Sequence, residues 1–438
     1  MAPVDDATSS IASSLIILNG FLVFFMQVGF IALETGSGRA KNVRNILLKN
    51  LLDAMLTAIC WWAVGYAFAY GQTANGIIGY SGFFYEGDLA MGHQRPWFLS
   101  FTFAVACCVI VSGCLAERTR LVVYPLYTVL ITALVHPLLV HWIWVDYSWL
   151  NSLGPCRVLD FAGGLAVHAL GGLFGLIGAI AVGPRLGRFD DGAVKDLPGH
   201  DMAFVTLGTF MLWFGWFGFN SGSVYVYQPT APSNAVQLVA MNTTLSASSA
   251  GLASLAVACW WSGTYDLRVC CNGVLSGLVI VTGICGFVDP WAAAVCGLIA
   301  GVVYPLSSHA LLRLGIDDPL DSSAVHLVNG VAGLLLLSFM AKPHHVALLT
   351  GGSCGGLFYS TAGWAQLGIQ VLAITLTLAV GGVAAAALFF VLRRLNLLRV
   401  DQLTELAGID NIDHGGPAYP EFNMQTLHGM GSHNGVVR

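Results

Sequence analysis

Two histidines lie in segments made almost wholly of apolar and small residues, and an aspartate precedes each of them. His168 follows Asp160 by eight residues, and His326 follows Asp321 by five. An imidazole can donate and accept hydrogen bonds, and it changes charge near neutral pH. The pair therefore indicates proton handling or ligand binding in an apolar interior. The alternative is a pair of neutral imidazoles bonded to backbone carbonyls.

Asp160 has two interpretations of its own. It stands just before an apolar run, where a carboxylate satisfies the free N–H groups that begin a helix. It could also be a fixed negative charge at the entrance for a cation. We expect a buried structural role with an electrostatic consequence, and we assign Asp321 a similar supporting role near His326.

The composition is that of a protein with many membrane spans. Of 438 residues, 56% are hydrophobic and only 9% are charged, against roughly 25% charged in soluble proteins. The 52 glycines suit helices that pack closely in lipid. The net charge of −5 and the lack of a basic cluster argue against nucleic acid. Most cysteines fall in apolar runs, but Cys156 and Cys354 fall in expected outer loops, and a disulfide between them is left open.

Eleven segments are apolar and long enough to cross a bilayer of about 20 helical residues. We therefore predict an all-α membrane protein with a transmembrane domain over residues 1–394 and a polar cytoplasmic tail over residues 395–438. The expected spans are 11–35, 46–70, 97–116, 121–144, 160–183, 201–222, 235–262, 272–288, 290–312, 322–341 and 364–392.

The basic residues predict the orientation of these spans, because Lys and Arg concentrate in inner loops. With the N-terminus outside and the C-terminus inside, only Arg95, Arg157 and Lys342 fall outside. The inner loops and tail then hold fifteen: Arg39, Lys41, Arg44, Lys49, Arg118, Arg120, Arg185, Arg188, Lys195, Arg268, Arg313, Arg393, Arg394, Arg399 and Arg438. Two further histidines, His136 and His141, lie near the outer end of the fourth span and are expected at the membrane interface.

A short echo relates the two histidine segments. Residues 166–168 read Ala-Val-His, and residues 324–326 read the same. Five spans separate them, so their helices cross the membrane in opposite directions. This is the arrangement of a five-plus-five inverted repeat, which brings paired sites together near the midplane.

Several longer blocks resemble the ammonium transporter/methylammonium permease family, and in particular its plant-like eukaryotic branch. The resemblance runs in order from about residue 20 to 420. It is carried by residues 25–30, 34–37, 40–50, 116–118, 160–168, 214–223, 272–273 and 317–319.

The resemblance implies a homotrimer of eleven-helix protomers, each with a narrow pore. By motif, His168 and His326 are similar to the twin pore histidines, and Trp216 is assigned to the pore one turn deeper than Phe219. Trp144 and Ser223 match the outer recruitment site for the cation, and Phe103 and Phe219 match aromatics at the pore mouth and gate. Without the resemblance, Trp144 would be read as an interfacial tryptophan and the two phenylalanines as packing residues.

The sequence departs from the family pattern at three places. Leu99 aligns with the outer phenylalanine of the gate, so the gate is half aromatic unless Phe98 substitutes for it. Leu327 and Asn329 replace usual glycines after the second histidine and should alter helix packing there. In the tail, Ile412 stands where plant members carry a phosphorylatable threonine, so that form of shut-off is not expected.

These features predict a transporter and not an enzyme, with no cofactor or metal. Ammonium, with methylammonium as its analogue, would bind as a cation through aromatic faces, lose its proton and pass as ammonia along the histidines, which could relay the proton. We expect a multi-pass protein of the plasma membrane, with a possible cytoplasmic regulator at the tail. The alternatives are an ammonium sensor with little flux, a Rhesus-type ammonia or carbon dioxide channel, and a haem protein ligated by His168 and His326.

Overall fold

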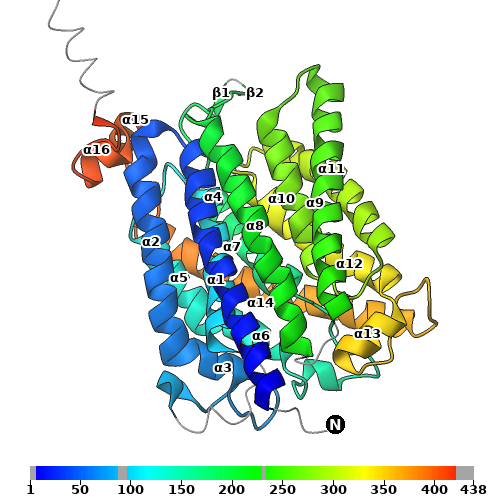
Figure 1. The fold of residues 1–438 in the computed structure, drawn as a ribbon. Coiled ribbons are helices and arrows are strands. Elements are labelled where there is room, and N and C mark those ends of the chain that lie inside the picture. Colours follow the sequence, from blue (N-terminus) through cyan, green and yellow to red (C-terminus); the bar gives the residue numbers. More distant parts are fainter. Residues whose placement is uncertain (1–5, 87–95, 191, 229–232, 421–438) are drawn as a thin grey trace, which may run out of the picture.

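The chain folds into a bundle of helices with a short two-stranded ribbon at one end (Figure 1). The structure is a computed structural model that describes residues 6–86, 96–190, 192–228 and 233–420, with side chains from residue 10. Arg95, Arg438 and residues 421–438 of the expected tail lie outside the described residues.

The α-helices of the bundle are α1 (Asp6–Ser37), α2 (Val43–Cys60), α3 (Tyr66–Tyr70), α4 (Trp97–Leu115), α5 (Val123–Leu130), α6 (His136–Trp144), α7 (Leu170–Val182), α8 (Met202–Tyr227), α9 (Ser233–Ser262), α10 (Leu267–Thr282), α11 (Pro290–Arg313), α12 (Asn329–Met340), α13 (Pro343–Thr350), α14 (Gly363–Arg394), α15 (Gln402–Ala407) and α16 (Ile409–Asp413). Four π-helical segments continue some of them: η2 (Trp61–Gly65), η5 (Ile131–Val135), η7 (Gly164–Ala169) and η8 (Ser323–Val328). Short 3-10 turns are η1 (Ala40–Asn42), η3 (Phe83–Tyr85) and η6 (Leu150–Ser152). The ribbon pairs β1 (Phe189–Asp190) antiparallel with β2 (Ala193–Val194).

Within the described residues, nine helical stretches are long and apolar enough to cross a membrane. They are Ser10–Ser37, Ala40–Tyr70, Trp97–Leu115, Val123–Trp144, Gly164–Val182, Met202–Tyr227, Pro290–Arg313, Ser323–Met340 and Gly363–Arg394. Two other expected spans are also helical. α9 is long but rich in Asn, Ser and Thr, and α10 is apolar but only 16 residues long.

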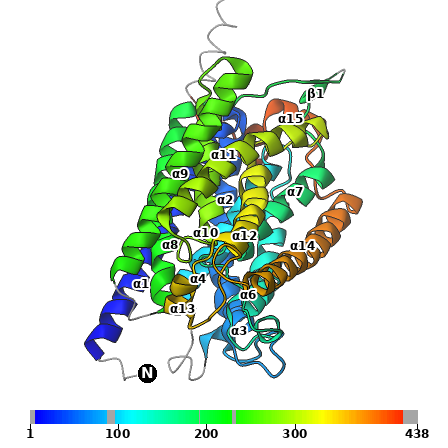
Figure 2. The same cartoon turned by 90° about the vertical axis from the view of Figure 1, so that its right-hand side faces the viewer.

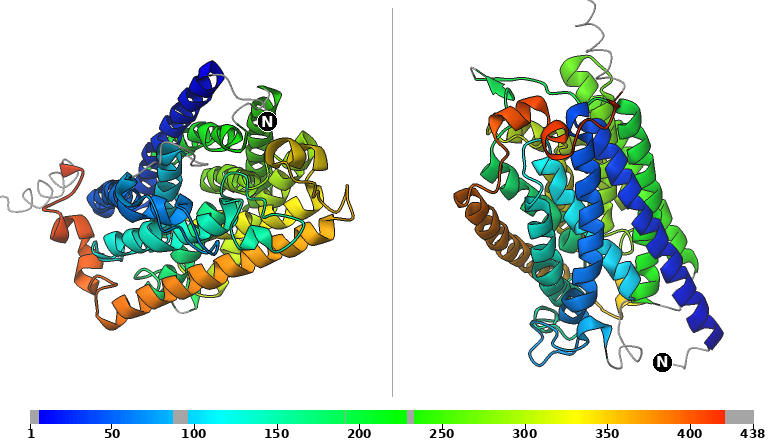
Figure 3. Two further views of the ribbon diagram at one scale, coloured as in Figure 1. Left: turned by 90° about the horizontal axis from the view of Figure 1, so that it is seen from below. Right: turned by 90° about the vertical axis from the view of Figure 1, so that its left-hand side faces the viewer.

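The centre of the bundle is α4. In its most apolar window 94% of the residues are buried, against 28% in α14. α1 packs along α8, and their ribbons run side by side in Figures 1 and 3. The long helix α14 crosses the outside of the bundle obliquely, over α7 and α12 (Figure 2). The core therefore lies between the helices that carry the two histidine segments.

The two histidine segments share a backbone irregularity. Each begins with non-helical residues and then enters a π-helix, η7 for His168 and η8 for His326. Gly163, just before η7, has a left-handed φ of +103°, and a Cβ there would approach Val167 Cγ2 to 2.7 Å. Asp321 has φ +58° just before η8. Such breaks inside a membrane protein occur where the backbone lines a cavity or is covered by protein.

The segments expected on the inner side gather at one end of the bundle, opposite the start of α1. Figure 1 shows α15, α16 and the β1–β2 ribbon at this end, beside the beginning of α2. The tail also pairs with the connection between α4 and α5 through the bridge between Thr119 and Arg399. The described part of the expected tail is thus folded against the helices.

Candidate functional site

Aromatic rings and imidazoles form a continuous buried column. The centroids of Trp144 and Phe103 are 6.0 Å apart, and Phe103 stacks on Phe219 at 4.1 Å. The ring of Phe219 lies 5.5 Å from that of His168, and His168 lies 5.2 Å from His326. The column draws on α6, α4, α8, η7 and η8, so distant parts of the chain meet in one line.

The two histidines contact each other directly. Their Nδ1 atoms are 3.2 Å apart, and the rings lie at an interplanar angle of 16°. One Nδ1 must donate while the other accepts, so the pair shares one hydrogen between them. His168 Nε2 is buried without a hydrogen-bond partner. On the other side of His168, the indole of Trp216 stacks at 5.1 Å and donates to Thr282 Oγ1.

The direct contact also bears on the haem alternative. A haem with two axial histidines holds its macrocycle between them, and rings in contact leave no such space. Among the described residues, no group of three or more His, Cys, Asp or Glu side chains is placed to hold a metal. The two imidazoles at this site are placed to hydrogen bond to each other.

Asp160 supports the backbone before His168. Its Oδ1 accepts from Gly163 N at 3.2 Å, and its Oδ2 accepts from Leu165 N and Ala166 N at 3.0 Å each. The carboxylate is fully buried. It therefore satisfies N–H groups that the irregular start of η7 leaves without helical partners.

The counterpart of Asp160 near the second histidine is Asp318, and the sequence analysis missed it. Asp318 Oδ2 accepts from Ser323 N at 2.7 Å and from the Ser323 hydroxyl. Asp321, which we had assigned the supporting role, instead accepts from Tyr304 and Ser308 of α11 at 3.0 and 2.7 Å. The signal was present, since Asp318 precedes His326 by eight residues, the same spacing as Asp160 and His168.

Trp144 and Ser223 both lie near the Phe103 end of the column. Trp144 Nε1 donates to the carbonyl of Asp160 at 2.7 Å, and Tyr227 donates to the same carbonyl at 3.2 Å. Ser223 donates to Phe219 O in its own helix at 3.1 Å, so its oxygen can still accept a hydrogen bond. The structure thus ties Trp144 to the Asp160 backbone and places Ser223 one turn after Phe219.

Two small cavities flank the column. One, lined by Tyr70, Pro96, Leu99, Ser100, Phe103 and Val226, adjoins the Phe103 end. The other adjoins His326 and is lined also by Phe30, Leu33, Glu34, Val109, Ile110, Asn272, Leu275, Leu320, Ser322 and Val325. Each has a volume of about 10 Å³, which is room for about one water-sized molecule. The stacked Phe103 and Phe219 rings stand between the first cavity and the histidines.

The departures from the family pattern have local explanations. Leu99 lines the cavity outside Phe103, so an aliphatic side chain takes the outer position. Leu327 packs against Gly172, where a Cβ would come within 2.9 Å of Leu327 Cβ. Asn329 donates to Ala324 O at 3.0 Å and so satisfies a carbonyl of η8. Leu327 is therefore accommodated by the lack of a side chain at Gly172, and Asn329 by its hydrogen bond to η8.

His136 and His141 are not at a surface. Both are fully buried, and their Nδ1 atoms lie 3.0 and 2.8 Å from the carbonyls of Ala166 and Ala69. Neighbouring helices cover α6 and bury both side chains, and their position at the membrane interface stays a prediction. His136 and His141 therefore bond to backbone carbonyls. This is the arrangement that was the alternative for His168 and His326.

The disulfide that the sequence left open is formed. Cys156 and Cys354 are bonded, with their Cα atoms 5.6 Å apart and a sequence separation of 198. The bond joins the segment before η7 to the connection between α13 and α14. It therefore fixes the loops at the Trp144 side of the column.

At the other end of the bundle, buried ion pairs join segments that are distant in the chain. Glu117, with a left-handed φ of +75°, accepts from Arg39 and Arg185 at 3.0 and 2.6 Å. Arg185 also pairs with Asp317 at 2.8 Å. Burial alone would raise the pKa of Glu117, but the two arginines outweigh it and lower the pKa to about 2. This cluster is consequently ionised at any physiological pH.

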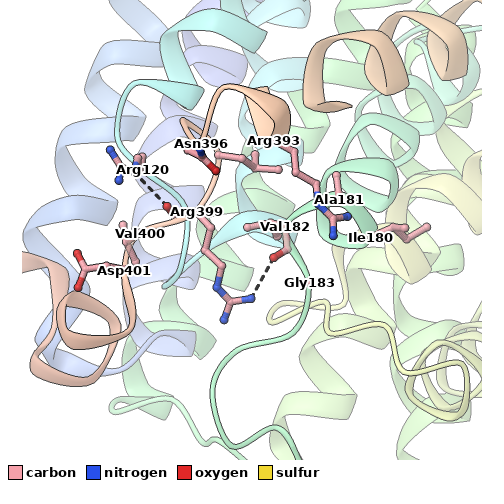
Figure 4. Close-up of a pocket in the computed structure, with 11 residues that line it drawn as sticks. Arg120, Ile180, Ala181, Val182, Gly183, Arg393, Asn396, Arg399, Val400 and Asp401 are labelled. Carbon is pink, nitrogen blue, oxygen red and sulfur yellow. Dashed lines mark hydrogen bonds between the residues drawn. The ribbon is translucent and has the colours of Figure 1, made fainter. Parts of the chain in front are cut away.

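The tail contacts this end of the bundle around a separate cavity. The cavity has a volume of about 440 Å³ and lies between α7, α14 and residues 398–401. Figure 4 shows Arg399 reaching toward α7, where its Nη1 donates to Val182 O at 3.0 Å. In the same view, Arg120 Nε donates to Arg399 O at 3.1 Å. This cavity lies at the tail junction and shares no lining residue with the cavity beside His326.

Comparisons with known proteins agree with this geometry. A sequence profile described as Ammonium Transporter Family matches residues 14–419. The chain is 39% identical over 404 residues to Ammonium transporter 3 of Dictyostelium discoideum, covering 91% of each. It is 38% identical over 418 residues to Ammonium transporter 1 member 1 of Arabidopsis thaliana, covering 90% of this chain and 82% of that one. A solved structure described as Sensor Amt Protein is similar at a TM-score of 0.84 and 32% identity, over 94% of this chain and 100% of that one.

Proposed function

The chain belongs to the ammonium transporter family, and we propose that it carries ammonium across a membrane through the column from Trp144 to His326. The observation that carries the proposal is the direct contact of two buried imidazoles behind a stack of aromatic rings. The same geometry supports the roles that the resemblance implied for these residues.

Selectivity in this proposal comes from chemistry. Ammonium and potassium are similar in size and charge, but only ammonium can lose a proton. The cation is held at Trp144, Ser223, Phe103 and Phe219, where aromatic faces attract it and the Ser223 oxygen accepts a hydrogen bond. A charge cannot cross the apolar column without a large desolvation cost. Ammonia has no such cost and can exchange hydrogen bonds with His168 and His326.

The histidine pair gives a route for the released proton. Because the two Nδ1 atoms share one hydrogen, a proton that reaches His168 can leave from His326 after a shift across 3.2 Å. The proton then rejoins ammonia on the inner side. Asp160 and Asp318 hold the two π-helices, and through them the distance between the rings.

The wider architecture is part of the same proposal. It comprises eleven spans in a five-plus-five inverted repeat, the N-terminus outside, a homotrimer in the plasma membrane and a cytoplasmic tail that a regulator can reach. The equal spacing of Asp160 to His168 and Asp318 to His326 supports the repeat, since both aspartates bind the start of a π-helix.

The test is expression in cells that lack their own ammonium uptake. We expect the wild-type chain to restore growth on low ammonium and to take up labelled methylammonium. His168→Ala should abolish selective uptake, whereas His309→Ala, which changes an exposed residue of α11, should not. Surface-expressed protein that binds ammonium without uptake would instead make the chain a sensor, and transport would be rejected.

A further inference from the structure

A buried ion pair lies beside the column and has no part in the transport steps described above. Lys49 of α2 forms an ion pair with Glu34 of α1, and the two side chains are 0% and 3% exposed. Ser112 of α4 accepts from Lys49 at 2.6 Å and donates to Glu34 Oε1 at 2.5 Å. Asn50 donates to Glu34 Oε2 at 2.8 Å. Three helices therefore converge on one carboxylate.

Holding helices together does not by itself account for this pair. Removing two charges from water costs several kcal/mol per ion, and apolar residues of similar volume often stabilise a buried site as well or better. Ionisable groups within membrane spans generally face a cavity or pathway. The relevant question is which member of the pair reaches such a space.

Glu34 is the member of the pair that reaches a cavity. It lines the cavity next to His326, and Lys49 is absent from that lining. Among the lining residues, only Glu34 carries a negative charge, while Asn272 and Ser322 are polar and neutral. Among the described residues, only Ser112 donates to Glu34 Oε1, so this oxygen can accept from one more donor. His326 uses Nδ1 toward His168, which leaves Nε2 for the cavity.

We propose that Glu34 is a second ammonium-binding residue, at the inner end of the column, which receives the cation re-formed after ammonia has passed His326. This inference rests on the proposed transport. An ammonium ion has four N–H donors, and in this cavity the Glu34 carboxylate and the Ser322 hydroxyl are acceptors for them. The volume of about 10 Å³ fits one ion of this size.

Lys49 has a defined part in the same site. It neutralises Glu34 when the cavity is empty, so the site holds a cation only weakly and can release it. Conduction requires binding that is strong enough to admit an ion and weak enough to let it leave. Without Glu34, Lys49 would present an uncompensated positive charge next to the cavity and would repel ammonium.

The test measures the two directions of transport separately. Cells expressing each variant are preloaded with labelled methylammonium at several concentrations, and efflux per surface molecule gives a half-saturation concentration for the inner side. Influx of labelled methylammonium gives the half-saturation concentration for the outer side. For Glu34→Gln we expect the inner value to rise at least tenfold and the outer value to change less than twofold. For Lys49→Met we expect the inner value to fall.

A matched control is Asp53→Asn. Asp53 is also a buried carboxylate of α2, bonded to Thr128 and Tyr127, and it lines neither cavity. It should leave both half-saturation values unchanged in the molecules that reach the surface. If Glu34→Gln and Lys49→Met behave as this control does, the pair is only a helix contact and the inference is overturned. Failure of wild-type influx would instead reject the transport itself.

Discussion

Asp160 and Asp318 stand in the same relation to the two buried histidines. Each lies eight residues before its histidine. Asp160 accepts from three backbone N–H groups at the start of η7, and Asp318 accepts from the backbone N–H of Ser323 at the start of η8. The position of each imidazole therefore depends on a carboxylate that does not touch it. A site of two imidazoles 3.2 Å apart is sensitive to small shifts in either segment.

The first prediction concerns these carboxylates. Asp160→Ala removes the acceptor of three backbone N–H groups, so we expect a loss of roughly 2–4 kcal/mol in stability and of methylammonium uptake. Asp160→Asn keeps one carbonyl oxygen and should retain part of both. Thermal unfolding of the purified protein measures the first effect and tracer uptake the second. Asp289→Asn, which affects a partly exposed pair with Lys342, is the control and should cost less than about 1 kcal/mol. Equal effects of all three changes would contradict the role of Asp160.

A second prediction follows from the disulfide. Removing Cys156–Cys354 with the double change to serine should destabilise the protein by about 2–5 kcal/mol, because the bond closes a long loop of the unfolded chain. A reductant should lower the melting temperature of the wild type to that of the double variant and leave the variant unchanged. Cys259→Ser, at an unpaired half-buried cysteine, serves as the control. A wild type that is indifferent to reductant would show that the bond does not contribute to stability.

The third prediction is a pH dependence of stability that comes from the ion pairs around Glu117. The pKa of Glu117 falls from an ordinary 4.5 to about 2, and that of Asp317 also falls to about 2, because nearby arginines outweigh burial. A lowered carboxyl pKa stabilises the fold above the unfolded pKa, and the contribution is lost as pH falls toward 2. The shift of Glu117 corresponds to ~3 kcal/mol.

Glu117→Gln should therefore destabilise by a constant amount between pH 5 and 8, and by less at pH 3. Melting temperatures of the variant and the wild type across this range provide the measurement. Glu86→Gln, on an exposed residue of the connection after η3, should give no difference at any pH. If the difference in melting temperature between Glu117→Gln and the wild type increased as the pH fell, the lowered pKa of Glu117 would be refuted.

The fourth prediction concerns the docked tail. Asp410 accepts from the backbone N–H groups of Arg44 and Asn45 at 2.8 and 2.9 Å. Asp410→Ala should release α16, so limited proteolysis within residues 395–420 should become several times faster. Ile412→Ala changes a side chain that is 59% exposed. This variant should be cleaved at the same rate as the wild type. Unchanged cleavage of the Asp410 variant would mean that other contacts suffice to hold the tail.

The sequence predicted the helical class and the members of the column, because hydropathy and a long motif are local properties. The predicted ends of the spans were wrong where apolar residues are not helical. Residues 283–288 are apolar and were expected within a span, but α10 ends at Thr282 and they form a buried connection. The fifth span was expected from Asp160, but the left-handed Gly163 delays η7 to Gly164.

Contacts between distant residues were beyond sequence patterns. The pairing of Glu34 with Lys49 depends on how α1 lies against α2, and the burial of His136 depends on the helices around α6. Asp318 could have been found by its spacing from His326. Asp321 is closer to His326 in sequence, but its carboxylate accepts from Tyr304 and Ser308 of α11.

The corner between α1 and α2 depends on residues that are synthesised late, in the tail after α14. Lys41 donates to Glu405 O and Leu406 O at 2.7 and 2.6 Å, and Asn42 accepts from Ile409 N at 3.0 Å. While the chain is being synthesised, this early corner is exposed until more than 360 further residues have emerged. A chain that ends before residue 405 lacks these contacts and leaves the α1–α2 corner uncovered, so cellular quality control could recognise it there.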